Sequence, residues 1–126
     1  MSVEEFIEDL PFISLLGIEL KDVGDGSATG SLEMLEELSW KADELLAHGG
    51  VTFTLAEATG AAAIAELRDP PVFTIDARTD YLDLAQGDLI ARADVVRDGG
   101  DIGVADVTVT DEREEAVAKI SAVYKV

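Results

Sequence analysis

Hydrophobic and polar residues change their spacing several times along the chain, and each change marks a predicted element. Residues 3–16 predict a short amphipathic helix that runs into an apolar turn ending at Gly17. Residues 18–33 alternate around a glycine-rich turn at residues 24–26, which predicts a hairpin of two strands. Residues 35–47 are mixed in character and predict an irregular connection.

The segment from Gly49 to Leu67 predicts one long buried helix. It is rich in alanine and apolar on nearly every face. It holds no proline before Pro70 and Pro71, which are expected to stop the helix.

After Pro71 the spacing of apolar residues changes to two, the period of a strand with one buried face. Tight turns at residues 86–88 and 98–101 and an acidic loop at residues 111–115 separate four predicted strands. These strands cover residues 72–82, 89–97, 102–110 and 116–126. Two strands, one helix and four strands, in that order, predict an α+β protein with a long helix packed on an antiparallel sheet.

The composition predicts one domain covering residues 1–126, which is long enough to bury a core without disulfides. The chain has no cysteine, so disulfides, thiolate metal sites and cysteine nucleophiles are excluded. His48 is the one histidine, so a single chain cannot build a metal site from several histidines. We therefore expect no metal site.

The charge is strongly negative, because 27 acidic residues against 9 basic residues give a formal net charge of −18. Such a chain repels polyanions and anionic surfaces, so we expect no nucleic acid and no membrane partner. Acids spread along the whole length, with few lysines, indicate a protein that works in high salt, as in a halophile. No segment has the pattern of a signal peptide or a membrane span, which predicts a cytoplasmic protein.

Glu57 is the first candidate for chemistry, because it places a carboxylate inside the predicted buried helix. A buried carboxylate is costly unless it is paired, hydrated in a cleft or used in a reaction. The alternative is that Glu57 lies on a solvated stripe together with Glu66. The tripeptide His48-Gly49-Gly50 stands at the start of the same helix, where free amides and the helix dipole favour negative charge.

Three groups of residues, spanning residues 45 to about 110, occur in an order typical of a known family. They are His48-Gly49-Gly50 with Glu57; then Thr74, Asp76, Tyr81 and Leu82; then Gly87-Asp88 and Gly99 at the turns. The chain thereby resembles hotdog-fold acyl-CoA thioesterases of the phenylacetic-acid-degradation (PaaI) type. The resemblance implies a curved antiparallel sheet wrapped around one long central helix, with a short N-terminal helix.

The resemblance also implies a reaction, the hydrolysis of a short-chain or aromatic acyl-CoA to a free acid and coenzyme A. It implies no cofactor, because coenzyme A is part of the substrate. The Gly49 amide is expected to polarise the thioester carbonyl, and Glu57 to act as nucleophile or as general base for water. These residues are eight positions apart, about 12 Å along one helix, so both cannot touch one carbonyl. We therefore expect a homodimer or homotetramer, with Gly49 of one subunit facing Glu57 of another.

Other residues have weaker claims to the site, and each has an ordinary structural alternative. His48 is a candidate general acid, but a ring hydrogen bond that orients the loop is favoured. Thr74 helps to hold the attacking water in relatives, or is an ordinary strand threonine. The substrate-binding candidates are Gly50, Tyr81, Arg97, Gly99 and Gly100. The alternative for Tyr81 is that its side chain only fills the face of the sheet. The alternative for Arg97, Gly99 and Gly100 is that they form a solvated hairpin tip. Cations expected to meet the anionic ligand are Arg97, Arg78, Arg68 and Lys41.

Ala42 and Ala61 depart from the family pattern, because relatives carry polar side chains at both positions; Gly100 replaces a frequent basic residue. Because of these departures, a second function stays possible, in which the protein binds acyl-CoA without turning it over. A hydratase or dehydratase is a weaker alternative. The acyl group is not determined by the sequence. Its pocket is expected to involve Phe53, Phe73, Trp40 and the N-terminal segment of a neighbouring chain.

Overall fold

The computed structural model describes residues 1–68 and 71–126, so the predicted stop at Pro70 lies outside the described residues. Short helices α1 (Val3–Glu8) and α2 (Pro11–Leu16) open the chain, and the long helix α3 covers Gly49–Ala65. One 3₁₀ turn, η1, covers Glu36–Leu38 in the irregular connection. The strands are β1 (Glu19–Gly24), β2 (Ser27–Leu32), β3 (Phe73–Tyr81), β4 (Leu89–Asp98), β5 (Ile102–Thr110) and β6 (Ala116–Lys125).

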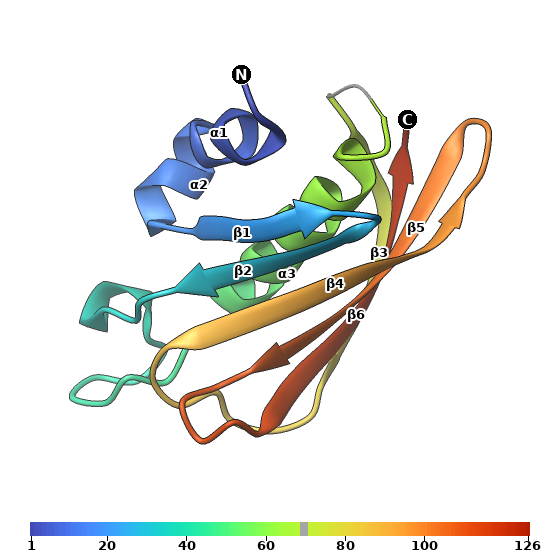
Figure 1. The fold of residues 1–126 in the computed structure, drawn as a ribbon. Coiled ribbons are helices and arrows are strands. Elements are labelled where there is room, and N and C mark those ends of the chain that lie inside the picture. Colours follow the sequence, from blue (N-terminus) through green and yellow to red (C-terminus); the bar gives the residue numbers. More distant parts are fainter. Residues whose placement is uncertain (69–70) are drawn as a thin grey trace.

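The six strands form one antiparallel sheet in the order β1-β2-β4-β5-β6-β3. Figure 1 shows this sheet curving around α3, with α1 and α2 lying beyond β1 at one end. Both short helices also contact α3. The predicted α+β architecture, with a curved antiparallel sheet around one central helix, is confirmed.

The N-terminal segment differs from its prediction, because it forms two helices instead of one helix and a turn. Pro11 stands in the first turn of α2, where its fixed φ and missing N–H suit a helix start. Gly17 ends α2 at a φ of 72°, the left-handed conformation that glycine adopts without strain.

The connection from β3 to β4 was predicted as a tight turn at residues 86–88, and this prediction is wrong. β3 pairs with β6 at one edge of the sheet, whereas β4 lies between β2 and β5. Residues 82–88 therefore cross the end of the sheet instead of closing a hairpin. Alternation shows which face of a strand is buried but not which strand it pairs with, and this is why the pattern misled.

The inner face of the sheet is lined with small residues, which lets the alanine-rich helix α3 approach closely. Ala28, Ala91, Ala93, Ala105 and Ala122 on four strands are all almost fully buried. Gly30 shows how close the contact is, because a β-carbon added there would stand 2.2 Å from Oγ1 of Thr59 in α3. A bilayer span needs about 20 apolar residues, and no helix in the described part of the chain meets that requirement.

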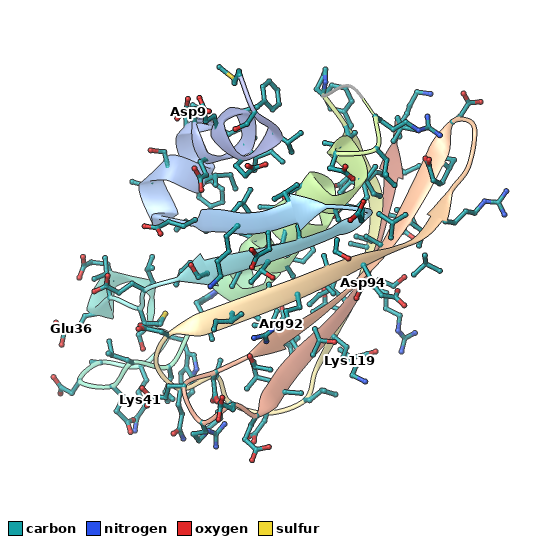
Figure 2. The ribbon with its side chains drawn as sticks, viewed as in Figure 1. Asp9, Glu36, Lys41, Arg92, Asp94 and Lys119 are labelled. Carbon is teal, nitrogen blue, oxygen red and sulfur yellow. The ribbon has the colours of Figure 1, made fainter. Side chains whose placement is uncertain are left out.

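The outer face of the sheet is polar and charged. Figure 2 shows Arg92, Asp94 and Lys119 on this face, projecting from β4 and β6. Asp94 lies directly opposite Asp106 of β5, so two like charges face each other across the strands. Such a pair is unfavourable in dilute buffer, and dissolved salt screens its repulsion.

Asp111 connects the loop between β5 and β6 to the crossing segment at residues 82–88. It is 5% exposed, and its carboxylate accepts hydrogen bonds from the backbone N–H of Gln86 at 2.9 Å and of Arg113 at 3.0 Å. The Arg113 guanidinium donates from Nε to Asp111 at 2.9 Å and from Nη2 to the carbonyl of Leu84 at 2.9 Å. Burial by itself raises the pKa of Asp111, but these hydrogen bonds and the positive charge of Arg113 hold that pKa below its ordinary value.

Replacing Asp111 with Asn should lower the free energy of unfolding near neutral pH by about 2 kcal/mol, because hydrogen bonds to a buried charge are weakened. A carboxyl with a depressed pKa stabilises the fold above its unfolded-state pKa, and this stabilisation is lost as the pH falls through the folded-state value. The difference between wild type and variant should therefore shrink below about pH 4. Urea unfolding across pH, with exposed Asp101→Asn as the control, measures it; a difference independent of pH contradicts this account.

Candidate active site

Glu57 lies in the middle of α3, and its carboxylate points toward β3. Oε1 accepts a hydrogen bond of 2.8 Å from Oγ1 of Thr74. Burial raises the pKa of Glu57, and the hydrogen bond from Thr74 lowers it in part. Glu66 has a different role, because its carboxylate accepts the backbone N–H of Gly26 at 3.1 Å. Glu57 is therefore not one of two equivalent carboxylates on a solvated stripe.

A bulge in β3 explains why Thr74 faces the helix. Thr74 pairs with Tyr124 and Asp76 pairs with Val123, so Ile75 is an extra residue in the strand. Strict alternation would place Thr74 and Asp76 on the same face of the sheet. The extra residue turns Thr74 to the inner face, where its hydroxyl reaches the carboxylate of Glu57.

Tyr124 anchors α3 at the same point from β6. Its side chain is fully buried, and its hydroxyl donates a 2.8 Å hydrogen bond to the backbone carbonyl of Glu57. Gly60 makes this contact possible, because a β-carbon there would stand 2.5 Å from the Tyr124 hydroxyl. Thr74 and Tyr124, which are neighbours across β3 and β6, therefore hold the side chain and the backbone of Glu57 respectively.

Gly49 is the first residue of α3, and the contacts around it leave its amide free. Nδ1 of His48 accepts the N–H of Gly50 at 2.9 Å and so caps the helix. The hydroxyl of Tyr81 donates to the carbonyl of Gly49 at 2.8 Å. The N–H of Gly49 has no acceptor within residues 1–68 and 71–126. The structure therefore presents an unpaired amide at a helix N-terminus, where the dipole favours negative charge.

Glu57 and Gly49 line two different cavities of the same chain. The N-terminal cavity, of about 60 Å³, lies between α1, α2 and α3 and includes Glu57 in its wall. The helix-start cavity, of about 170 Å³, is lined by Gly49, Trp40 and Tyr81 among others. The acid and the free amide are therefore separated within one subunit, as their spacing along the helix predicts.

A comparison with known proteins gives the family of this chain. The model of the Thioesterase superfamily matches residues 46–118, which include Gly49, Glu57, Thr74 and Tyr81. The chain belongs to the thioesterase superfamily. This membership supports a hydrolase activity of the thioesterase type.

Individual relatives of this thioesterase cover nearly its whole length. A Halobacterium salinarum protein named "Putative esterase" is 34% identical over 122 residues, covering 93% of this chain and 81% of the relative. A crystal structure of a protein from the thioesterase superfamily has a TM-score of 0.91 and 30% identity, covering 98% of this chain and 95% of the other. The E. coli PaaI protein of the phenylacetic acid degradation operon has a TM-score of 0.85 at 21% identity, with 96% and 87% covered. The hotdog fold of the PaaI type is thus confirmed.

The basic residues expected near an anionic ligand of the thioesterase are mostly engaged elsewhere. Arg68 bonds Asp98 at 2.7 Å and the carbonyls of Gly99 and Gly100, so it holds the hairpin between β4 and β5. Arg78 pairs with Asp80 at 3.2 Å, and Lys41 pairs with Glu44. Arg97 forms no salt bridge within the part of the chain that the structure describes, and of the four it is the available cation.

The aromatic residues expected at the acyl pocket do not line the cavity that holds Glu57. Phe73 is 62% exposed on the outer side of β3, and Trp40 lines the helix-start cavity instead. Phe53 lines neither cavity. The residues that do line the N-terminal cavity beside Glu57 include Phe6, Leu10 and Ile13, and the α3 residues Ala58, Ala61 and Ala65. Within residues 1–68 and 71–126, no three acidic or histidine side chains are grouped as metal ligands.

Tyr124, Gly60 and the bulge at Ile75 are the parts of the site that the sequence did not predict. A tyrosine in a terminal strand has the pattern of an ordinary core residue, and its hydroxyl contact depends on the packing of β6 against α3. A signal was present at Gly60, because a glycine inside an alanine-rich helix indicates close contact with another group.

Replacing Thr74 with Val should raise the pKa of Glu57 further, because the hydrogen bond that stabilises the ionised carboxylate is lost while burial remains. An NMR titration of the Glu57 side-chain carboxyl carbon measures this directly and requires no catalytic activity. Thr79→Val on the same strand is the matched control. An unchanged or lower Glu57 pKa in the Thr74 variant contradicts the assigned contact.

Proposed function

We propose that this thioesterase hydrolyses an acyl-CoA thioester at a site shared by two subunits. Glu57 of one subunit acts on the carbonyl, and the Gly49 amide of the other subunit polarises it. The observation that carries the proposal is the separation of the two groups: the carboxylate with a raised pKa and the unpaired helix-start amide lie in different cavities of one chain.

The edge strand β3 is the surface proposed to join the two subunits. It pairs on one side with β6, and its other side has no strand partner in the described chain. Phe73 is 62% exposed, Ile75 54% and Tyr81 56%. A long edge strand with exposed apolar side chains favours pairing with another strand, and a second copy of β3 supplies one.

Antiparallel pairing of β3 with its copy brings the two halves of the site together. Thr74 lies near one end of the strand and contacts Glu57, whereas Tyr81 lies at the other end and contacts Gly49. A two-fold axis near the middle of β3 places Thr74 of each copy opposite Tyr81 of the other. Glu57 of one subunit then approaches Gly49 of the next, at two equivalent sites per dimer.

The chemistry follows from these two groups. Negative charge develops on the thioester oxygen during attack, and the Gly49 N–H at the helix N-terminus stabilises it. Glu57 deprotonates the attacking water, or attacks the carbonyl itself to form an anhydride that water then cleaves. Both routes consume one water, break the carbon–sulfur bond, and release a carboxylic acid and the thiol of coenzyme A. A raised Glu57 pKa makes the carboxylate a stronger base.

Binding of the coenzyme A part is proposed at the hairpin of Arg97, Gly99 and Gly100, which supplies the available guanidinium.

High salt is the proposed working condition. Dissolved salt screens the repulsion within a chain of net charge −18, and also the repulsion between the facing carboxylates of Asp94 and Asp106. The relative named "Putative esterase" comes from Halobacterium salinarum. A cytoplasm of high ionic strength is the compartment that fits these features.

Replacing Glu57 with Gln or with Ala should lower kcat/KM by about 10²–10⁴-fold, because the base or nucleophile is removed. The assay follows release of coenzyme A thiol in molar salt from acetyl-, butanoyl- and phenylacetyl-CoA. Exposed Glu37→Gln is the control and should keep the wild-type rate. If acyl-CoA stabilises the wild type but is not turned over, the protein is instead a binding protein, a function that the apolar Ala61 favours. An unaltered rate in both Glu57 variants contradicts the proposal.

A shared site predicts complementation between two inactive variants. Gly49→Pro removes the amide N–H at a helix position where proline fits, and His48 already has the extended backbone (ψ of 141°) that precedes proline. Co-expressed with Glu57→Ala at equal levels, it should recover about a quarter of wild-type activity, because half the dimers carry one intact site.

Gly49→Ala controls for the added β-carbon, which meets Tyr81 at 3.3 Å in either variant, and it should retain most activity because its amide remains. If the activity of co-expressed Gly49→Pro and Glu57→Ala stays at the background of the separate variants, the site is not built from two subunits.

A further inference from the structure

The N-terminal cavity is apolar apart from one carboxylate. Of the described residues that line it, Glu57 alone has a polar side chain. Phe6 and Leu10 belong to the N-terminal segment of the same chain, and Ala58, Ala61 and Ala65 belong to α3. The cavity therefore offers hydrocarbon contact on all described sides, next to the group proposed to attack a carbonyl.

The alanines that line the cavity follow one another along the axis of α3, starting beside Glu57. Ala61 follows Glu57 by one helical turn and Ala65 by two, which corresponds to about 6 Å and about 12 Å along the axis of α3. All three alanines line the cavity and are at most 8% exposed, so their methyl groups form part of its apolar wall. An acyl chain whose carbonyl lies at Glu57 can therefore extend along the methyl groups of Ala58, Ala61 and Ala65.

The volume of the cavity limits what can enter. At about 60 Å³ it is well below the roughly 150 Å³ of an apolar cavity that admits benzene. In a space of this size, we expect a chain of a few carbons to fit more readily than a ring, which would need α1 and α2 to move. A hydroxyl or charged group on the chain would be buried without a partner, since the wall offers no polar contact beyond Glu57.

We propose that this cavity is the acyl chamber of the enzyme, and that it selects short, unsubstituted aliphatic acyl groups, with Ala61 setting the space beyond the carbonyl and Leu10 closing it from the N-terminal segment. This inference rests on the proposed thioesterase function and adds the substrate class to it. It also assigns the chamber to the chain that carries Glu57, whereas the sequence pointed to a neighbouring chain.

The first test is the profile of kcat/KM across acetyl-, butanoyl-, hexanoyl- and phenylacetyl-CoA in molar salt. Butanoyl-CoA should be preferred, with phenylacetyl-CoA at least about tenfold lower, since a misfitting group in an apolar pocket costs at least this factor. A preference for phenylacetyl-CoA, or equal values for all four, overturns the proposal.

Two substitutions should change that profile in opposite directions. Ala61→Val narrows the chamber and should lower kcat/KM for butanoyl-CoA about tenfold while changing acetyl-CoA less than about threefold. Leu10→Ala opens it at a residue that is 41% exposed, and should raise the relative rate with hexanoyl- and phenylacetyl-CoA. Ala116→Val, at an exposed position at the start of β6, is the matched control. Unaltered profiles in both chamber variants overturn the assignment of the cavity.

A binding measurement separates this inference from the proposed reaction. Addition of butanamide, a neutral compound with the same carbon chain, should shift the NMR signal of the Ala61 methyl group in the wild type. Ala61→Val should weaken that binding, as followed at the methyl group of Ala65. If no acyl-CoA is turned over but the shift is seen, the proposed hydrolysis fails and the chamber stands. If hydrolysis occurs and butanamide leaves the Ala61 signal unchanged, the chamber fails and the reaction stands.

Discussion

The close packing of α3 on the inner face of the sheet is the constraint on which the rest of the structure depends. Small residues on both surfaces allow this contact, and Gly30 and Gly60 mark where even a methyl group is excluded. Because the helix lies so close, Tyr124 can bond the backbone of Glu57 and Thr74 can bond its carboxylate. The same packing brings Tyr81 to the carbonyl of Gly49. One helix held at a fixed distance thus positions both candidate reacting groups.

Much of the fold follows from the sequence, because its signals are local. The alanine-rich run with no proline gave the central helix, and period-two alternation with glycine turns gave the strands. The pairing of β3 with β6 was not accessible in this way, because it depends on contacts between residues far apart in the sequence, such as Thr74 with Tyr124. The division of the N-terminal segment into two helices could be anticipated only at Pro11.

The candidate site was predicted where a residue type conflicts with its surroundings. Glu57 stood out as a charge in an apolar helix, and Gly49 as a glycine at a helix start. The cations were assessed less well, because the sequence does not show that Arg68 is engaged by Asp98. Thr74 was named, but the bulge at Ile75 that turns it inward depends on the register between β3 and β6. Residue chemistry is local, whereas the partner of each side chain is a property of the tertiary structure.

The position of α1 and α2 has a consequence for how this enzyme can diverge. The groups proposed to carry out the reaction lie within residues 48–57, whereas part of the wall beside them comes from residues 6–13, which precede the sheet in the chain. Mutations in that opening segment can reshape the space for the ligand while the β-strands and the reacting groups stay unchanged. Evolution, or a protein engineer, can therefore alter selectivity through the residues of α1 and α2 without rebuilding the catalytic framework.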